Sequence, residues 1–343
     1  MTALPDANLL SNRSYFLGVD VGGTNIRALL VDQDLNSCGW VSGMTDVTST
    51  DRTVDSIARA IDQVLESANV PADRVRAVGL GVPGQVQAGV VKMAVNLNLE
   101  SYPLASELSE RFGLPFELEN DGRTAAMGAY RLISQRKKIN HLAYLSIGTG
   151  ISAGLILNGL LYRGANGMAG EIGHMVVEPQ GPLCSCGAWG CLEALAAGPA
   201  IAREAQNAVE RGELTMLGNY DPITPQVVFK ASQLDDPVAV NVIQRSSYYL
   251  SRAIQWLVMT YDVEMVVLGG GVSHAGDAFL LPVLNEIEKI RSQSDLAANM
   301  LSRDKVILLP SDYDAGVWGA IVLAQKIAQK SYPAARVSLK EVQ

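Results

Sequence analysis

Residues 170–193, here called the Cys/His segment, constrain the fold of this chain more than any other part of the sequence. The whole chain has only 4 cysteines and 3 histidines. The segment contains four of these seven residues, His174, Cys184, Cys186 and Cys191. Three thiolates and one imidazole complete a tetrahedral ligand set for Zn²⁺, and a site with four protein ligands is structural rather than catalytic. We therefore predict a structural zinc ion, with the neighbouring carboxylates of Glu171 and Glu193 fixed in a polar binding site.

The cysteines also have two simpler interpretations, either buried thiols or one disulfide with a free cysteine. Residues 1–12 contain no lysine and no apolar core of useful length, so no secretory signal is predicted before Asp20. The cytoplasm is then the expected location, and its reducing conditions disfavour disulfides and favour a metal. Cys38, outside the segment, is predicted to be an ordinary buried thiol.

Length and composition favour a globular protein of two domains. A chain of 343 residues exceeds what one hydrophobic core usually supports. Its content of 48% hydrophobic and 18% charged residues is typical of folded domains. No apolar run reaches about 18 residues, so no membrane span or membrane partner is expected. The net charge of −8 argues against a nucleic-acid partner.

The sequence near the N-terminus predicts a strand, a tight turn and a second strand. Residues 15–31 place Gly22-Gly23-Thr24, the first glycine turn, between two apolar runs. Two residues without a Cβ let backbone amides approach a phosphate, and Thr24 adds a hydroxyl donor. Asp20, just before the turn, has the ligand type that Mg²⁺ prefers. An ordinary hairpin with a surface aspartate is the open alternative.

Two further glycine turns strengthen the phosphate interpretation. Residues 142–157 repeat the pattern about 125 residues later, around Gly148-Thr149-Gly150, the second glycine turn. The repetition suggests two related domains that each offer a turn to one ligand. Gly269-Gly270-Gly271, the third glycine turn, ends another apolar strand and suits a nucleotide base or ribose. None of the three matches a P-loop or a Rossmann fingerprint.

These turns, in this order, resemble the fold of sugar kinases, hexokinases and actin-type ATPases. With the Cys/His segment, the chain resembles the ROK family of repressors and sugar kinases from Phe16 to about Ile327. The resemblance rests on Asp20-Val21-Gly22-Gly23-Thr24, Gly148-Thr149-Gly150, Gly170-Glu171-Ile172-Gly173-His174 and Cys184-x-Cys186-Gly187-x-x-Gly190-Cys191-x-Glu193. It implies an α/β protein with a two-domain ribonuclease H-like or actin-type ATPase fold and a structural zinc knot in the larger domain.

The resemblance also implies a discontinuous domain order. Residues 1–120 with about 315–331 are expected to form a small α/β domain, which holds the first glycine turn and part of a sugar site. Residues 121–314 are expected to form a large α/β domain with the other two turns and the zinc knot. We expect the tail from Ser331 to be frayed, and a homodimer is usual for the resemblance.

Site residues follow from the resemblance by position. Asp121 corresponds to the catalytic base. The sugar ligands correspond to Gly84, Gln85, Asn96, Asn120, Asp121, Glu171, His174 and Glu193. The ATP and phosphate contacts correspond to Asp20, Gly22, Gly23, Thr24, Gly148, Thr149, Gly150, Gly269, Gly270 and Gly271, with Mg²⁺ bound to the ATP. The zinc ligands are His174, Cys184, Cys186 and Cys191, and His174 is expected to present its second ring nitrogen to the sugar.

A carboxylate at position 121 suits the expected chemistry, because a sugar hydroxyl is a poor nucleophile until a base removes its proton. The alternative for Asp121 is a helix N-cap, since the following residues predict a helix. The chain departs from the family pattern near the sugar. Gly122-Arg123 follows the base, Asn98-Leu99-Glu100 replaces a Pro-Gly-Trp continuation, and Gln85 stands where proline is common.

The sequence therefore predicts an ATP-dependent hexose kinase, with glucose converted to glucose 6-phosphate as the first choice. An N-acetylmannosamine or N-acetylglucosamine kinase is the alternative. A sugar-responsive repressor of the same family is the remote alternative, because such repressors add an N-terminal winged helix and Asp20 follows only 19 residues. The identity of the hexose and the choice between ATP and polyphosphate stay open.

Overall fold

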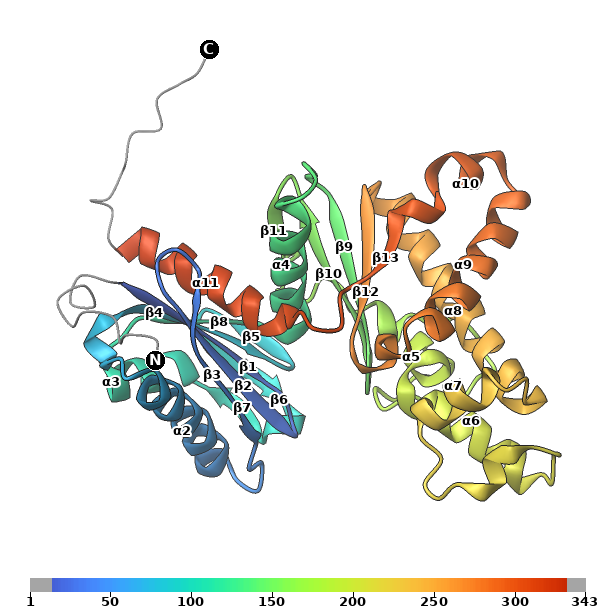
Figure 1. Cartoon of the computed structure of the whole chain (residues 1–343), viewed down its shortest axis with the longest axis horizontal. Helices are drawn as coiled ribbons and strands as arrows, with labels where there is room; N and C mark the ends of the chain where they lie inside the picture. Colours follow the sequence, from blue (N-terminus) through green and yellow to red (C-terminus); the bar gives the residue numbers. More distant parts are fainter. Residues whose placement is uncertain (1–13, 332–343) are drawn as a thin grey trace, which may run out of the picture. The chain divides into compact units, whose positions relative to one another are not determined.

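The computed structural model describes residues 14–331, which form two compact units (Figure 1). The first unit runs to Leu132 and resumes at Asp314, and the second comprises Ile133–Tyr313. Residues 1–13 of the expected small domain and the tail beyond Ser331 lie outside the described residues.

A five-stranded sheet with the order β3-β2-β1-β4-β8 forms the centre of the first unit. Its strands are β1 (Tyr15–Val21), β2 (Asn25–Val31), β3 (Ser37–Met44), β4 (Val75–Val82) and β8 (Phe116–Asn120). The first three are antiparallel neighbours, whereas β4 is parallel to both β1 and β8. Strands buried on both faces have nearly continuous apolar sequences. Asp20 is the exception in β1, where it is a carboxylate within an otherwise uncharged strand.

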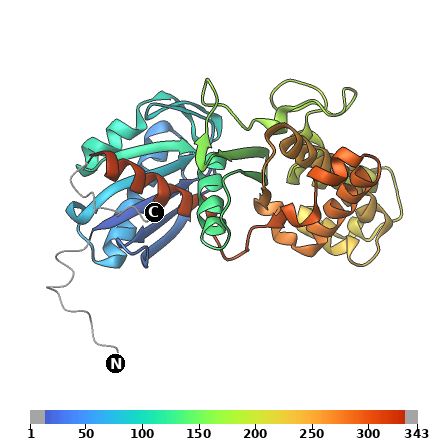
Figure 2. The same ribbon diagram turned by 90° about the horizontal axis from the view of Figure 1, so that it is seen from above.

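Helices cover both faces of this sheet. Helix α2 (Thr50–Ala68) packs on the face formed by Leu17 and Val19, and α11 (Ala315–Ser331) packs on the opposite face. Figures 1 and 2 both show α11 lying along the sheet. Gly79 of β4 makes this close approach possible, because a Cβ there would lie 2.1 Å from the carbonyl oxygen of Ala320.

The first unit contains further helices, 3-10 turns and a second, smaller sheet. They are α3 (Leu104–Phe112), α4 (Asp121–Ser134), the 3-10 turns η1 (Ala72–Arg74) and η2 (Val95–Leu97), and a small antiparallel sheet of β5 (Gln85–Gln87), β6 (Val90–Ala94) and β7 (Leu99–Tyr102). Helix α4 packs against the start of α11, where a Cβ on Gly128 would lie 2.0 Å from the carbonyl oxygen of Ala315. By these contacts, α4 belongs to the first unit as far as Leu132. The predicted boundary between the domains was at residue 120, before this helix. The suggested domain limits remain a prediction.

The second unit contains a sheet of the same design. Its order is β11-β10-β9-β12-β13, again with three antiparallel strands followed by two parallel additions. The strands are β9 (Leu142–Ile147), β10 (Ile151–Leu157), β11 (Leu160–Tyr162), β12 (Met265–Gly269) and β13 (Val306–Leu308). The first and second glycine turns therefore occupy equivalent places, each between the first two strands of its sheet.

Helices pack on the second sheet and complete its core. They are α5 (Leu192–Ala196), α6 (Gly198–Glu210), α7 (Pro225–Ser232), α8 (Pro237–Tyr261), α9 (Asp277–Ser292) and α10 (Asp295–Met300). The 3-10 turns are η3 (Ile172–His174), η4 (Met216–Asn219), η5 (Gly271–Ala275) and η6 (Arg303–Lys305). None of the helices within residues 14–331 is long and apolar enough to cross a membrane.

Candidate functional site

The predicted zinc ligands converge in the second unit. The ligand atoms of His174, Cys184, Cys186 and Cys191 all lie within 4.8 Å of one another. The Cys186 and Cys191 sulfurs are 3.6 Å apart, and the Cys184 sulfur is 3.7 Å from Nδ1 of His174. A tetrahedral zinc ion with Zn–S distances of about 2.3 Å places neighbouring sulfurs about 3.8 Å apart. The donor set and its spacing therefore fit a structural zinc ion.

The cysteines of the described chain are all free thiols, which removes the disulfide alternative for the Cys/His segment. The loop that holds them depends on tight backbone turns. Cys184 N donates to Ala188 O at 2.8 Å, and Gly187 has a φ of 90° that favours glycine. Cys38 differs from its prediction because it is half-buried on β3, and within residues 14–331 one side of this edge strand has no neighbouring strand.

The ring of His174 has two distinct nitrogens. Nδ1 faces the cysteine sulfurs, so Nε2 is the nitrogen that remains for another partner. Metal ligation at one nitrogen fixes the tautomer and the orientation of the ring. Glu171 is exposed at the N-cap of η3, three residues before His174.

In the second unit, two glycine turns lie side by side. A Cβ on Gly148 would lie 3.7 Å from the backbone nitrogen of Gly271. Gly270 has a φ of 86°, and a Cβ there would lie 2.5 Å from Ile147 O. The structure therefore brings the second and third glycine turns together, as a site for one nucleotide requires.

Glu193 lies against the second glycine turn. Its Oε2 accepts a hydrogen bond from the backbone N–H of Ile151 at 2.9 Å. A Cβ on Gly150 would come within 2.4 Å of the same oxygen. Glu193 was predicted to contact the sugar alone, and its contact with this turn was not predicted.

In the first unit, Asp20 lies at the end of β1 beside the first glycine turn. Arg27 of β2 forms ion pairs with Asp20 and, at 2.8 Å, with Asp314. Burial raises the pKa of Asp20 to about 6, and the charges of Asp314 and Asp121 act in the same direction. Arg27 opposes this rise. The carboxyl group of Asp20 therefore exchanges its proton nearer to neutral pH than an ordinary aspartate does.

The first glycine turn is held by the loops around it. Thr45 Oγ1 donates to Gly22 O at 2.7 Å, and Thr45 N donates to Thr24 O at 2.9 Å. A Cβ on Gly23 would lie 3.1 Å from Asn96 O. The structure therefore places Asn96, a predicted sugar ligand, directly beside this turn.

Asn120 and Asp121 lie where β8 ends and α4 begins. Oδ1 of Asp121 accepts hydrogen bonds from Gly122 N at 2.8 Å and from the Asn120 side-chain amide at 3.0 Å. The same amide donates to Gly84 O at 3.1 Å. Three predicted sugar-site residues therefore form one hydrogen-bonded group, and Gln85 follows it at the start of β5.

The alternative that Asp121 caps α4 is wrong, because the capping side chain belongs to the preceding residue, Asn120. Oδ1 of Asn120 accepts from Arg123 N at 3.1 Å, so the side chain of Asn120 caps the first turn of α4. The carboxylate of Asp121 accepts a hydrogen bond from the backbone N–H of the next residue of the helix, Gly122. Burial, above all, raises the pKa of Asp121, and the charge of Arg123 lowers it.

A buried ion pair lies next to Asn120 and Asp121 in the chain, and the sequence did not predict this pair. Arg123 Nε donates to Glu119 Oε1 at 2.8 Å, and the two side chains are 2% and 4% exposed. Glu119 Oε1 also accepts from Asn120 N at 2.9 Å. The unusual Arg123 was visible in the sequence, but its burial and its pairing with Glu119 were not.

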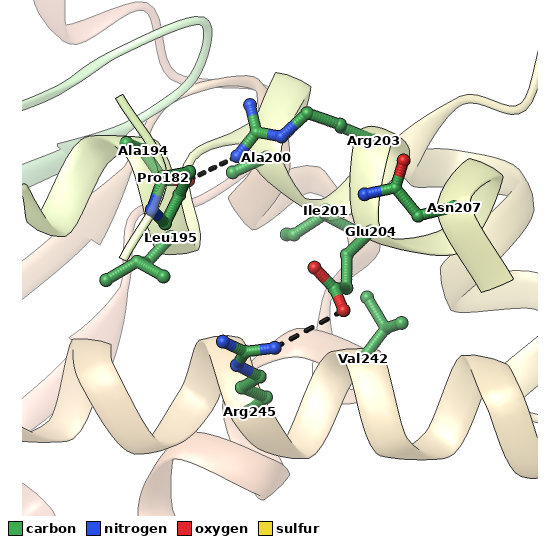
Figure 3. A pocket seen from close by; sticks show the side chains of 10 residues that line it. All are labelled: Pro182, Ala194, Leu195, Ala200, Ile201, Arg203, Glu204, Asn207, Val242 and Arg245. Carbon is green, nitrogen blue, oxygen red and sulfur yellow. Dashed lines mark hydrogen bonds and ion pairs between the residues drawn. The ribbon is translucent and has the colours of Figure 1, made fainter. Parts of the chain in front are cut away.

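A separate cavity in the second unit is too small for the expected substrates. Its volume is about 90 Å³, whereas small-molecule sites usually enclose about 300–1,000 Å³. Figure 3 shows two pairs of polar groups in it, Arg245 with Glu204 at 3.3 Å and Arg203 with the carbonyl oxygen of Ala194. Its lining residues are Pro182, Ala194, Leu195, Ala200, Ile201, Arg203, Glu204, Asn207, Val242 and Arg245. We assign this cavity no part in the site.

Two sheets of the same order, each with a glycine turn between its first two strands, define an α/β protein with the actin-like fold of two related units, and the predicted fold class is confirmed. The chain belongs to the ROK family, whose model matches residues 16–327. The His/Cys cluster is consistent with the zinc site of that family.

Similar proteins include kinases of more than one sugar. A glucokinase of Halalkalibacterium halodurans is 34% identical over 287 residues, which cover 80% of this chain and 85% of that protein. An N-acetylmannosamine kinase of Citrobacter koseri is 29% identical over 314 residues, which cover 90% and 98%. The crystal structure of a ROK family glucokinase from Streptomyces griseus in complex with glucose and AMPPNP has a TM-score of 0.75 at 30% identity, and covers 91% of this chain and 100% of that chain.

Proposed function

We propose that this protein is an ATP-dependent sugar kinase that converts glucose to glucose 6-phosphate. The observation that carries the proposal is the half-buried Asp121, whose carboxylate is held by Asn120 and Gly122 at the start of α4. A base with a raised pKa accepts a proton more readily near neutral pH than an ordinary aspartate does. The similarity to glucokinases over most of the chain supports the choice of glucose.

Each group of residues has its own role in the proposed phosphoryl transfer. Asp121 removes the proton from the sugar hydroxyl as its oxygen attacks the γ-phosphate, a contribution of about 10²–10⁴ in rate. Asn120 and Gly84 position that carboxylate and the sugar. The backbone amides of the first and second glycine turns bind phosphate oxygens. Alignment of the two substrates supplies much of the remaining acceleration.

The first unit offers the kind of ligand atom that Mg²⁺ prefers. Asp20 offers a hard oxygen ligand next to the first glycine turn, and Mg²⁺ is commonly held by one or two carboxylates, water and substrate phosphates. When bound with ATP, the ion neutralises charge that develops on the transferred phosphoryl group. Zinc fits the Cys/His segment and has a structural role, since all four of its positions are filled by protein ligands.

An N-acetylhexosamine kinase is the second candidate, favoured by the similarity to an N-acetylmannosamine kinase over 90% of this chain. Glu100 stands near the predicted sugar residues where glucokinases of the family have a different continuation. Glucose and an N-acetyl sugar differ by an amide that needs its own space and hydrogen bonds. The sugar preference therefore separates the two candidates.

The test is an ADP-release assay over glucose, mannose, fructose, N-acetylglucosamine and N-acetylmannosamine. We expect the largest kcat/KM with glucose. Higher kcat/KM with an N-acetyl sugar would replace the glucose assignment by the second candidate. A parallel assay of glucose 6-phosphate formation from polyphosphate identifies the donor. A folded, zinc-containing protein that binds sugar but turns over none of the five would be a sugar-responsive regulator, and the kinase proposal would fail.

A further inference from the structure

The Cys/His segment packs directly on the strand that follows the second glycine turn. Gly170 O accepts a hydrogen bond from Ala153 N at 2.7 Å. A Cβ on Gly173 would lie 2.0 Å from Ile151 O, so no side chain fits between the segment and β10 at this point. Ile151 and Ala153 belong to β10, which begins one residue after the turn. The position of the turn is therefore tied to the backbone of the segment.

Glu193 adds a side-chain contact at the turn itself. Its Oε2 accepts from Ile151 N at 2.9 Å and fills the space where Gly150 has no Cβ. Cys191, a predicted zinc ligand, is the N-cap residue of α5, and Glu193 lies in the first turn of that helix. A metal that fixes Cys191 thus fixes the start of the helix that carries Glu193.

We propose that Glu193 is a positioning residue for the second glycine turn, and that it makes the geometry of this nucleotide-binding turn depend on the zinc-binding segment. The inference rests on the proposed function, in which the turn binds phosphates of ATP. It adds a second role to Glu193. One carboxylate oxygen holds Ile151 N, and the other remains for a sugar hydroxyl.

The negative charge of Glu193 shows whether this residue positions the turn or attracts the nucleotide directly. A carboxylate beside a turn that binds phosphates repels a nucleotide, since like charges repel more strongly where water is excluded. Its benefit must then come from the hydrogen bond to Ile151 N, which orders the backbone before the nucleotide arrives. A neutral side chain that keeps the acceptor should therefore keep the affinity, and one that removes the acceptor should lose it.

The experiment is calorimetric titration of Mg²⁺·ADP into the zinc-loaded full-length protein without sugar. In the absence of sugar, a residue that contacts only the sugar has no effect on the measured Kd. We expect Glu193→Ala to weaken ADP binding about 10-fold, the order of a charge-assisted hydrogen bond, and Glu193→Gln to stay within about threefold of the unmodified protein. Glu178→Ala, which removes another carboxylate of the Cys/His segment, is the matched control and should bind ADP normally.

Glu193→Asp is the second informative variant. It keeps the charge but is one methylene shorter, so its oxygen does not reach Ile151 N, and we expect the same loss as in Glu193→Ala. Zinc content and circular dichroism, measured on every variant, show that the fold is retained. If Glu193→Ala destroys the fold, the comparison of Asp and Gln at position 193 decides the question alone.

The outcomes separate this inference from the proposed function. ADP affinity that is equal in Glu193→Ala, Glu193→Asp and the unmodified protein overturns the positioning role, even if sugar turnover is normal. Equal weakening by Glu178→Ala and Glu193→Ala overturns it as well, because the effect would then belong to the segment in general. An unmodified protein that neither binds Mg²⁺·ADP nor phosphorylates any sugar refutes the proposed function and the inference together.

Discussion

The first and second glycine turns occupy the same place in two sheets of the same order, yet they are held by different means. In the first unit, the residues around the turn are charged, and Arg27 joins Asp20 to Asp314. In the second unit, the turn is held by Glu193 and by a segment that carries four predicted metal ligands. Equivalent turns are therefore held either by hydrogen bonds from Thr45, next to a group of ion pairs, or by a carboxylate and a segment of predicted metal ligands.

The difference matches the tasks proposed for the two units. Ion pairs beside the first turn keep the buried carboxylate of Asp20 next to Arg27, and the proposed function requires this carboxylate to take Mg²⁺ as a partner when ATP binds. A structural metal gives no such freedom, because its protein ligands fill every position. We infer that the first unit supplies the charged groups that take part in the reaction, whereas the second unit holds the nucleotide-binding turn in a fixed position. Five predictions test this comparison.

The largest expected effect is the loss of the metal from the second unit. Cys191→Ser removes one of four ligands, and metal binding contributes directly to folding in structural sites. We expect loss of zinc and an increase in hydrogen exchange of about 100-fold in residues 170–193 and in β10, equivalent to about 3 kcal/mol of local stability. Strands β1 and β2 should exchange as before.

Exchange measured by mass spectrometry, with zinc quantified on the same sample, checks this expectation. Cys38→Ser is the matched control, since Cys38 lies outside the cluster and should leave the zinc content unchanged. Equal loss of protection in both units would show that the metal stabilises the whole chain and would remove the contrast between the two turns.

The next effect concerns the proposed base in the first unit. Asp121→Asn keeps the size and shape of the side chain but cannot accept a proton from the sugar. We expect kcat to fall about 10²–10⁴-fold while sugar binding and zinc content persist. Asp34→Asn, a change in an exposed turn, serves as the control with normal turnover. Near-normal turnover of Asp121→Asn would show that another group is the base.

The pH profile of the unmodified enzyme gives an independent check on the same residue. The base must be ionised to act, and burial raises the pKa of Asp121 above 3.8. The value of kcat/KM should therefore fall as the pH decreases through this raised pKa. If kcat/KM instead fell only near pH 3.8, the ordinary pKa of an aspartate, burial would not raise the pKa of the base.

A third effect is on stability. Asp20 binds its proton more tightly in the folded state, because its pKa rises from 3.8 to about 6. The stabilisation is present below pH 3.8 and is lost as the pH rises through about 6. At pH 7, Asp20→Asn removes an ionised buried group and should increase the free energy of unfolding by up to about 3 kcal/mol.

Urea denaturation at pH 7 and pH 4 measures this gain, which should be much smaller at the lower pH. The same variant should lose ATP-dependent turnover, because Asn is a poor substitute for a carboxylate bound to Mg²⁺. A variant that is less stable at pH 7 would show that the ion pair with Arg27 outweighs the cost of burial.

The smallest expected effect concerns Arg27 itself. Its side chain is 43% exposed, so its ion pairs contribute at most about 1 kcal/mol to stability. Arg27→Met should nevertheless raise the pKa of Asp20 further, because Arg27 opposes the effect of burial. Carbon NMR titration of the Asp20 carboxyl measures the change. Lys92→Met, at an exposed position of the same unit, should leave that pKa unchanged.

Local patterns in the sequence predicted much of the fold and part of the site. The glycine turns lie between strands because apolar runs flank glycine in both places. The spacing of Cys184, Cys186 and Cys191 anticipated the cluster, since ligands this close in sequence need only one loop to converge. The family resemblance supplied Asp121 and Asn120, but propensity offered Asp121 as the cap of α4, whereas the structure shows that Asn120 caps it.

Contacts between distant segments were beyond the reach of such patterns. Arg27 pairs with Asp314, which is near the other end of the chain. Arg123 attracted notice as a departure, but only the structure shows that Glu119 neutralises it in a buried pair. Glu193 was expected to contact the sugar alone, because the sequence does not show that Ile151 N lies within hydrogen-bond distance.

The sequence by itself determined the class of fold, the family, the four candidate metal ligands and the positions of the three glycine turns. These features depend on residue type and short spacing, which a linear chain displays directly. Only the tertiary structure decided which charges neutralise one another, which nitrogen of His174 faces the thiols and which side chain holds the second glycine turn. Such choices depend on distances of about 3 Å between residues far apart in sequence, and only folding sets those distances.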